Sequence, residues 1–276
     1  MPAPNSSSRC VVVGIDGSRS ALQAALWAVD EAVDRDVPLR LVYAIDPSER
    51  EPGAEDAIRD TFAAIESTRK PVKMEAEVVH ERPIAALLAE SRSAAMVCVG
   101  STGLKHAVHG RIGSTASALV RSAHCSVALV PNSVLPSTTG CVLAVVEESP
   151  TSSAVMDLAL QESGVRGAPL RVLTVRPPQG NGLQDVEETV AASARIERYL
   201  ARWRRRHPTA DIQAIASHGS VVNYLEYLHR TADPVQVLVA DPRHPGPTDS
   251  LLGHSGRAAL DAARCILLIC DRQGWL

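Results

Sequence analysis

The sequence contains a long internal repeat. When the chain is shifted by 131 residues, the segment CVVVGIDGS that starts at Cys10 falls on the segment CVLAVVEES that starts at Cys141, with three identities on a shared apolar pattern. The same shift aligns residues 38–45 with residues 169–176. Near the C-terminal end of each copy a shift of 140 is needed, so the second copy carries nine extra residues in its middle. A period this long indicates duplication of a whole domain.

The length of the chain agrees with a duplicated domain. Its 276 residues are enough for two domains of ordinary size. We expect one domain over residues 1–135 and a second over residues 136–276, joined by the proline- and serine-bearing segment 133–140.

Each copy alternates short apolar runs with segments of helical period, which is the pattern of βαβ units and a parallel sheet. Near-continuous apolar runs such as residues 11–13 and 96–99 are typical of strands buried on both faces. Ser18 is placed to cap the first helix, whose apolar positions start at Leu22. The expected strands are residues 11–15, 39–45, 72–79, 95–99 and 126–130, then 142–146, 170–175, 212–215, 235–239 and 266–269, and the expected helices of the second copy lie near 152–162, 186–205, 221–230 and 255–264.

Composition excludes several functional classes. The formal net charge of −3 gives no electrostatic footprint for nucleic acid, and no apolar run approaches the roughly 18 residues of a membrane span. No secretory leader is evident at the N-terminus, and the six cysteines occur singly within apolar runs rather than in metal-binding or disulfide patterns. We therefore expect a cytoplasmic protein with reduced, structural cysteines and no metal site made of protein side chains.

The loop that follows the fourth expected strand is rich in glycine and leads into a helix. Gly100 and Gly103 allow the backbone to approach an anion closely, and Gly113 precedes two hydroxyl residues, Ser114 and Thr115, at the start of the helix. The amides and dipole of a helix N-terminus favour phosphate. The loop is neither a Walker A motif nor a dinucleotide fingerprint, and a flexible connection is the alternative interpretation.

The spacing of these residues resembles the motif of the universal stress protein family. Gly100 and Gly103 are separated by two residues, nine residues follow, then Gly113 and Ser114, and Asp16 at the end of the first strand also matches. The resemblance covers essentially the whole chain as two tandem copies. It implies two flavodoxin-like α/β domains, each with a five-stranded parallel sheet of order 3-2-1-4-5 and helices on both faces. It also implies ATP binding, dimerisation through edge strands, and a role as a stress-responsive regulator or effector.

The resemblance also implies a role for each matching residue. Asp16 would accept hydrogen bonds from nucleotide hydroxyl or amino groups or from a water, with a turn or N-cap role as the alternative. The ligand would be ATP, with or without Mg²⁺. The implied contacts are Gly14, Ile15 and Asp16 beside the adenosine, Ala44 at the adenine, Val99 and Gly100 near the ribose, and Gly103, Gly113, Ser114 and Thr115 around the phosphates.

The second copy departs from this motif. A β-carbon at a glycine position should obstruct the approach of a ligand to the backbone, and proline lacks an amide donor. We expect the second domain to keep the fold and lose ordinary nucleotide affinity, although Arg243 and Gly253 leave a residual anion site open. The departures are Glu147 for Asp16, Ala240 for Gly100, Arg243 for Gly103, His254 for Ser114, and the two prolines Pro245 and Pro247 within the loop.

Three classes of function remain after these observations. The first is an ATP-binding regulator that hydrolyses ATP slowly or not at all, because no catalytic constellation is recognisable. The second is an interaction protein that works without nucleotide, and the third is an ATP-consuming enzyme. We expect a homodimer or an intramolecular pseudo-dimer with an approximate twofold axis, with contributions from strands 126–130 and 266–269, and a protein partner that the sequence does not identify.

Overall fold

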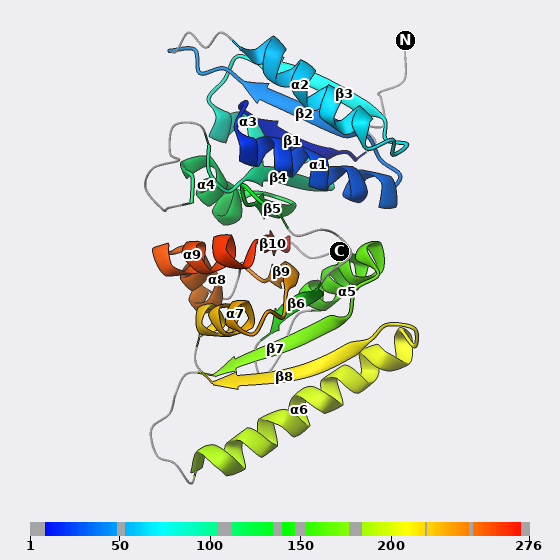
Figure 1. Ribbon diagram of the computed structural model, residues 1–276, viewed down its shortest axis with the longest axis vertical. Coiled ribbons are helices and arrows are strands. Elements are labelled where there is room, and N and C mark those ends of the chain that lie inside the picture. The colour runs from blue at the N-terminus through cyan, green and yellow to red at the C-terminus, as the bar shows by residue number, and fades with distance from the viewer. Residues whose placement is uncertain are drawn as a thin grey trace. The chain divides into compact units, whose positions relative to one another are not determined.

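The chain divides into two compact units, formed mainly by Met1–Ser133 and Val134–Cys270. Figure 1 draws both units, and each is an α/β structure with a parallel sheet. The computed structural model describes residues 9–48, 53–103, 112–134, 140–146, 153–176, 184–218, 220–242 and 245–271.

The sheet of the first unit has the strand order β3-β2-β1-β4-β5, and all neighbouring strands are parallel. This is the order expected from the sequence. Its central strands are buried on both faces: Val12 of β1 and Val97 of β4 have no exposed surface. The strands are β1 (Val11–Ile15), β2 (Leu39–Ala44), β3 (Met74–Val79), β4 (Met96–Gly100) and β5 (Ser126–Val130), so the third begins two residues later than expected.

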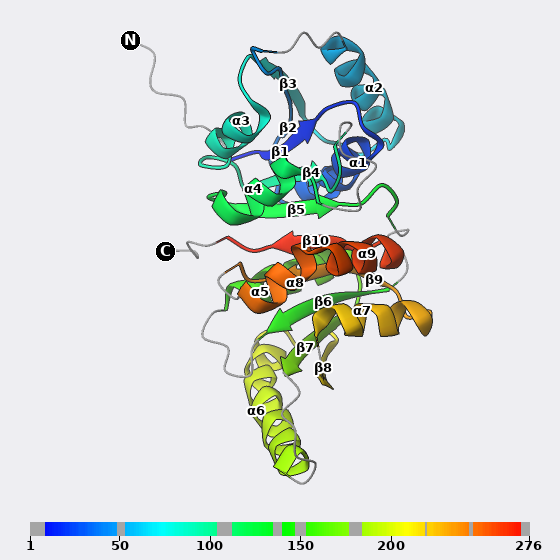
Figure 2. The ribbon, with the colours of Figure 1, turned by 90° about the vertical axis from the view of Figure 1, so that its left-hand side faces the viewer.

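Helices cover both faces of this sheet (Figure 2), α1 and α2 on one face and α3 and α4 on the other. Ser18 caps α1 as expected, since its side chain accepts a 3.2 Å hydrogen bond from the amide of Ala21. Gly113 is the N-cap of α4, which confirms that this glycine opens a helix. The bounds are α1 (Arg19–Asp34), α2 (Ala54–Ser67), α3 (Pro83–Glu90) and α4 (Ser114–Ser122).

The second unit repeats the topology of the first. Its strands follow the order β8-β7-β6-β9-β10, again with all neighbours parallel. The bounds are β6 (Cys141–Val146), β7 (Leu170–Arg176), β8 (Ile212–His218), β9 (Val235–Ala240) and β10 (Ile266–Ile269). The strand expected at residues 212–215 is therefore three residues longer than the pattern predicted.

The nine extra residues of the second copy lengthen one helix. Helix α6 (Gln184–Arg206) has 23 residues, whereas α2, at the corresponding place in the first unit, has 14. The C-terminal half of α6 packs against β8 and buries Ile196, Leu200 and Trp203. The other helices are α5 (Ala154–Arg166), α7 (Val221–Arg230), α8 (Pro245–Leu252) and α9 (His254–Ala263).

Helix α8 is a feature that the sequence pattern missed. Pro245 and Pro247 were expected to lie in an open loop, but they form the first turn of this helix. Proline is compatible with a first turn because the amides of that turn have no intrahelical acceptor. Helix α8 packs on α9 so closely that a β-carbon on Gly256 would lie 2.1 Å from the carbonyl oxygen of Ser250.

Within the described part of the chain, no helix is long and apolar enough to cross a membrane.

Alanine substitutions at two glycines of the second unit should have opposite effects on the free energy of unfolding. In Gly256→Ala the new methyl group meets the backbone of α8, so we expect the free energy of unfolding to fall by about 1–3 kcal/mol. In Gly164→Ala nothing lies within 4 Å of the new methyl group, and loss of glycine's backbone freedom should raise the free energy of unfolding by about 0.5–1 kcal/mol. Urea denaturation followed by circular dichroism measures both; equal effects would contradict the packing of α8 on α9.

The six cysteines are free and buried, as expected for structural residues. Burial raises the pKa of Cys141 to about 11 and that of Cys125 to about 12. At pH 8 only about one Cys141 thiol in a thousand is ionised, and the thiolate is the reactive form. We predict that the native protein does not react with Ellman's reagent at pH 8, whereas the denatured chain titrates six thiols. Rapid reaction of the folded protein would contradict this burial.

Candidate functional site

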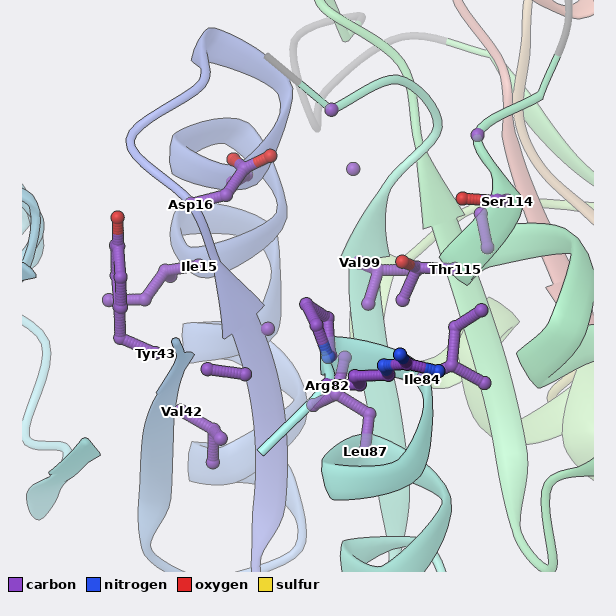
Figure 3. Close-up of a pocket in the computed structure, with 18 of the residues that line it drawn as sticks. Ile15, Asp16, Val42, Tyr43, Arg82, Ile84, Leu87, Val99, Ser114 and Thr115 are labelled. Atoms are coloured by element: carbon purple, nitrogen blue, oxygen red, sulfur yellow. The ribbon is translucent and has the colours of Figure 1, made fainter. Parts of the chain in front are cut away.

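A cavity of about 640 Å³ opens in the first unit at the carboxyl ends of β1, β2 and β4. Helices α3 and α4 contribute to its walls, as Figure 3 shows. Ligands of parallel α/β sheets bind at this edge. The cavity brings together all ten residues selected from the sequence, which are Gly14, Ile15, Asp16, Ala44, Val99, Gly100, Gly103, Gly113, Ser114 and Thr115.

One end of the cavity is formed by the start of α4. The amides of the first helical turn, from Ser114 to Ala116, have no intrahelical acceptor, and Gly113 has no side chain with which to cap them. Together with the helix dipole they form a site suited to an anion. The amide of Gly113 itself donates to the carbonyl oxygen of Ser101 at 2.9 Å, so it closes the loop rather than facing a ligand.

Glycine at position 113 leaves space at this end of the cavity because it has no side chain. A β-carbon there would lie 3.7 Å from the amide nitrogen of Gly103 and 3.7 Å from the carbonyl oxygen of Ser101. These are ordinary contact distances, so the empty protein tolerates the extra methyl group. The same methyl group would occupy part of the cradle between the loop and the helix.

Thr102 also lines this end of the cavity and was missed from the sequence. The residue is 5% exposed, and its Oγ1 has no hydrogen-bond partner among the described residues. Because Oγ1 has almost no accessible surface, the hydroxyl is enclosed by protein rather than open to the cavity.

Asp16 accepts a hydrogen bond within its turn and also lines the cavity. Its Oδ1 accepts a 2.9 Å hydrogen bond from the amide of Ser18, which is the turn role considered as the alternative. Its Oδ2 faces Gly103, where a β-carbon would come within 2.9 Å of it. Figure 3 shows Asp16 and Ser114 on opposite sides of the cavity. A side chain at Gly103 would therefore displace the carboxylate from this edge.

Gly100 lines the cavity and also has a packing role that was not expected from the sequence. A β-carbon on Gly100 would lie 2.3 Å from Oγ of Ser20 and 2.8 Å from its carbonyl carbon. The absence of a side chain thus allows the start of α1 to pack against the end of β4. Oγ of Ser20 also donates a short hydrogen bond to the carbonyl oxygen of Thr102, which ties α1 to the glycine-rich loop.

The other end of the cavity is apolar, and most of it was missed from the sequence. Its side chains come from β1, β2, α3 and β4. Gly14 allows α3 to approach β1, since a β-carbon there would lie 2.8 Å from Cδ1 of Leu87. The rule that ligands bind at strand ends could have directed the search to the loops after the second and third strands. The apolar lining includes Ile15, Val42, Tyr43, Ala44, Pro83, Ile84, Ala85, Leu87, Leu88 and Val99.

Two charged residues missed from the sequence lie at this apolar end. Asp46 follows β2 and Arg82 precedes α3, and both line the cavity. Nε of Arg82 lies 3.5 Å from Oδ2 of Asp46.

The corresponding positions of the second unit are arranged differently. Ala240, which aligns with Gly100, is 1% exposed at the end of β9. The carbonyl oxygen of the next residue, Asp241, accepts a 2.9 Å hydrogen bond from Oγ1 of Thr248 in α8. In the first unit the corresponding carbonyl, that of Ser101, accepts from Gly113 instead. Glu147 and Arg243 lie outside the described residues.

Steric contacts indicate that alanine at two motif glycines destabilises the fold in one case and leaves it nearly unchanged in the other. Gly100→Ala forces a methyl group against the backbone of Ser20, so we expect the free energy of unfolding to fall by about 1–3 kcal/mol. In Gly113→Ala the new methyl group meets nothing closer than 3.7 Å, so the free energy of unfolding should change by less than about 0.5 kcal/mol. Urea denaturation without added ligand tests the pair. A stable Gly100→Ala protein would show that α1 does not depend on this glycine.

Comparison with known proteins assigns the chain to a family. The family model described as "Universal stress protein family" matches residues 8–131. Universal stress protein Rv2028c of Mycobacterium tuberculosis is 41% identical over 278 residues, which cover 95% of this chain and 96% of that protein. Universal stress protein Rv3134c of the same species is 45% identical over 244 residues, which cover 85% of this chain and 88% of that protein.

A solved structure supports the fold over the full length. The universal stress protein from Archaeoglobus fulgidus has a TM-score of 0.65 and 13% sequence identity, with 97% of this chain and 99% of that chain covered. The sequence relatives and the fold agree with the glycine spacing and with the parallel sheet order. The chain belongs to the universal stress protein family.

Proposed function

We propose that the chain is an ATP-binding universal stress protein that acts as a stress-response regulator or effector, with its nucleotide site in the first unit. The observation that carries this proposal is a cavity that joins an apolar end to an end lined by helix amides. A nucleotide is divided in the same way, with a flat aromatic base at one end and charged phosphates at the other.

The lining suggests how a nucleotide would lie in the cavity. The base would be placed among Val42, Ala44 and Leu87, and the phosphates would accept hydrogen bonds from the first turn of α4. The ribose would then lie near Val99 and Gly100, between the two ends. This arrangement agrees with the roles that the family resemblance implies.

The structure supports the fit of a triphosphate at the amide end. The space beside Gly113 would be filled by a β-carbon. Among the described residues, no group of three or more His, Cys, Asp or Glu could hold a metal ion. Mg²⁺ would therefore enter as the counter-ion of the phosphates.

The second unit is proposed to lack this affinity. The carbonyl oxygen of Asp241 accepts a hydrogen bond from Thr248, so α8 holds the loop after β9. Gly253, at the position of Gly113, donates its amide to the carbonyl oxygen of Asp249 in α8 instead. Ala240 places a side chain where the first unit has Gly100. We expect one ATP per chain. Loss of several hydrogen bonds at about 1–3 kcal/mol each would weaken binding by orders of magnitude.

The regulatory assignment includes three further expectations. The protein acts in the cytoplasm, hydrolyses ATP slowly or not at all, and forms a homodimer or an intramolecular pseudo-dimer. Its signal would pass to a protein partner through a change of conformation on nucleotide binding. Light scattering of the purified protein with and without ATP measures the oligomeric state.

Isothermal titration with MgATP tests the site. Gly113→Ala should weaken ATP binding about tenfold or more, because its methyl group enters the phosphate cradle while the fold is kept. Asp16→Asn retains an acceptor for the amide of Ser18 and should also weaken binding, because its amide nitrogen cannot replace Oδ2 as an acceptor for the donor groups of the nucleotide. Gly164→Ala and Asp60→Asn, on α5 and α2, are the matched controls and should bind as the unmodified chain does.

The titration also separates the alternatives. A stoichiometry near one supports a single site, and a stoichiometry near two would show that the second unit binds ATP as well. Absence of binding would overturn the proposal in favour of an interaction protein that works without nucleotide. Unchanged affinity in both Gly113→Ala and Asp16→Asn would reject this cavity as the site.

A further inference from the structure

An ion pair lies at the apolar end of the cavity. Nε of Arg82 is 3.5 Å from Oδ2 of Asp46, and the two residues come from different loops, the first between β3 and α3 and the second directly after β2. Both line the cavity, and Figure 3 shows Arg82 among the side chains around it. The pair therefore connects two sides of the cavity at its mouth.

The two partners differ in how firmly they are held. Oδ1 of Asp46 accepts hydrogen bonds from the amide and the hydroxyl of Ser48, at 2.9 and 2.6 Å, and the side chain is 24% exposed. The side chain of Arg82 is 78% exposed, although its backbone carbonyl is fixed by the amide of Ala86 at the start of α3. Asp46 is thus a fixed anchor, and the guanidinium of Arg82 is free to adjust. An exposed pair of this kind contributes little to stability.

The order of the strands separates the Asp46–Arg82 ion pair from the phosphate end of the cavity. Strand β2 pairs with β1 and β3, whereas α4 follows β4 on the other side of β1. Two strand spacings amount to roughly 10 Å, so a guanidinium held by Asp46 lies near the expected base rather than near the first turn of α4. The apolar lining of the same cavity includes Val42, Ile84 and Leu87.

We propose that Arg82 is a specificity-determining residue for an aromatic base, whose open face its guanidinium covers while Asp46 positions it. This inference rests on the proposed nucleotide site and adds a residue to it. A planar guanidinium is attracted to the face of an aromatic ring, and the apolar wall would support the opposite face of the base. Among the described residues that line the cavity, Arg82 is the one Lys, Arg or His.

A contact with the base and a contact with the phosphates predict different results. A contact with the base is shared by adenosine, ADP and ATP. A contact with phosphate strengthens as phosphates are added, because the charge that Arg82 would meet increases. The ratio of affinities across this series therefore distinguishes a contact with the nucleoside from a contact with the phosphates.

The experiment is titration of the full chain with adenosine, ADP and MgATP. We expect Arg82→Ala to weaken all three by the same factor, about tenfold. Arg82→Lys should recover only part of the loss, because an ammonium group lacks the planar surface. Arg59→Ala is the matched control: Arg59 is also exposed and pairs with an aspartate, Asp56, but it lies on α2 outside the cavity lining.

The positioning role of Asp46 is tested by a double-mutant cycle. Asp46→Asn retains the acceptor for Ser48 and removes the charge that holds Arg82, so it should weaken adenosine binding about threefold. In the Arg82→Ala background the same change should have no further effect, whereas a purely structural role would give additive losses.

Each remaining outcome overturns the inference. A loss confined to ATP and ADP would assign Arg82 to the phosphates, and unchanged affinity in Arg82→Ala would show that it does not touch the ligand. Both results leave the proposed function standing. If the unmodified chain binds none of the three ligands, the proposed function fails together with this inference.

Discussion

The close contact between Gly100 and Ser20 is the constraint on which the candidate site depends. A β-carbon on Gly100 would lie 2.3 Å from the hydroxyl oxygen of Ser20, so only glycine allows α1 to start this near the end of β4. Once α1 is there, Ser20 donates to the carbonyl oxygen of Thr102 and Ser18 caps the helix. The turn that holds Asp16 and the loop that holds Gly103 are thereby fixed beside each other.

The second unit shows the same fold without a glycine at the position of Gly100. Ala240 occupies the position of Gly100, and the loop after β9 is held by α8 through the bond from Thr248 to the carbonyl of Asp241. The sheet order is unchanged, because it depends on buried strands such as β6 and β9 rather than on the loops. Sheet and site are therefore separable: the sheet depends on apolar burial, and the site depends on a few glycines.

The same separation explains what could be predicted from the sequence. Apolar runs and helical periods predicted the strands and their parallel arrangement, and local chemistry predicted the caps at Ser18 and Gly113. Contacts between distant segments were not predictable. The partner of Gly100 is Ser20 on another element, and the approach of Arg82 to Asp46 depends on how two loops leave neighbouring strands. Helix α8 was missed because its prolines, which normally indicate loops, stand in a first turn where proline is tolerated.

Different helices line the two ends of the cavity. This arrangement offers a way for nucleotide binding to change the surface that a partner contacts. The apolar end includes α3, the amide end is the start of α4, and the two helices pack against each other on one face of the sheet. A ligand that fills both ends contacts both helices at once, so its binding energy depends on their relative position. A ligand that fills only one end lacks this dependence. A full nucleotide would therefore stabilise one arrangement of α3 and α4, whereas its base or its phosphates alone would not. The exposed surface of these helices is where a partner could distinguish the protein with bound nucleotide from the protein without it.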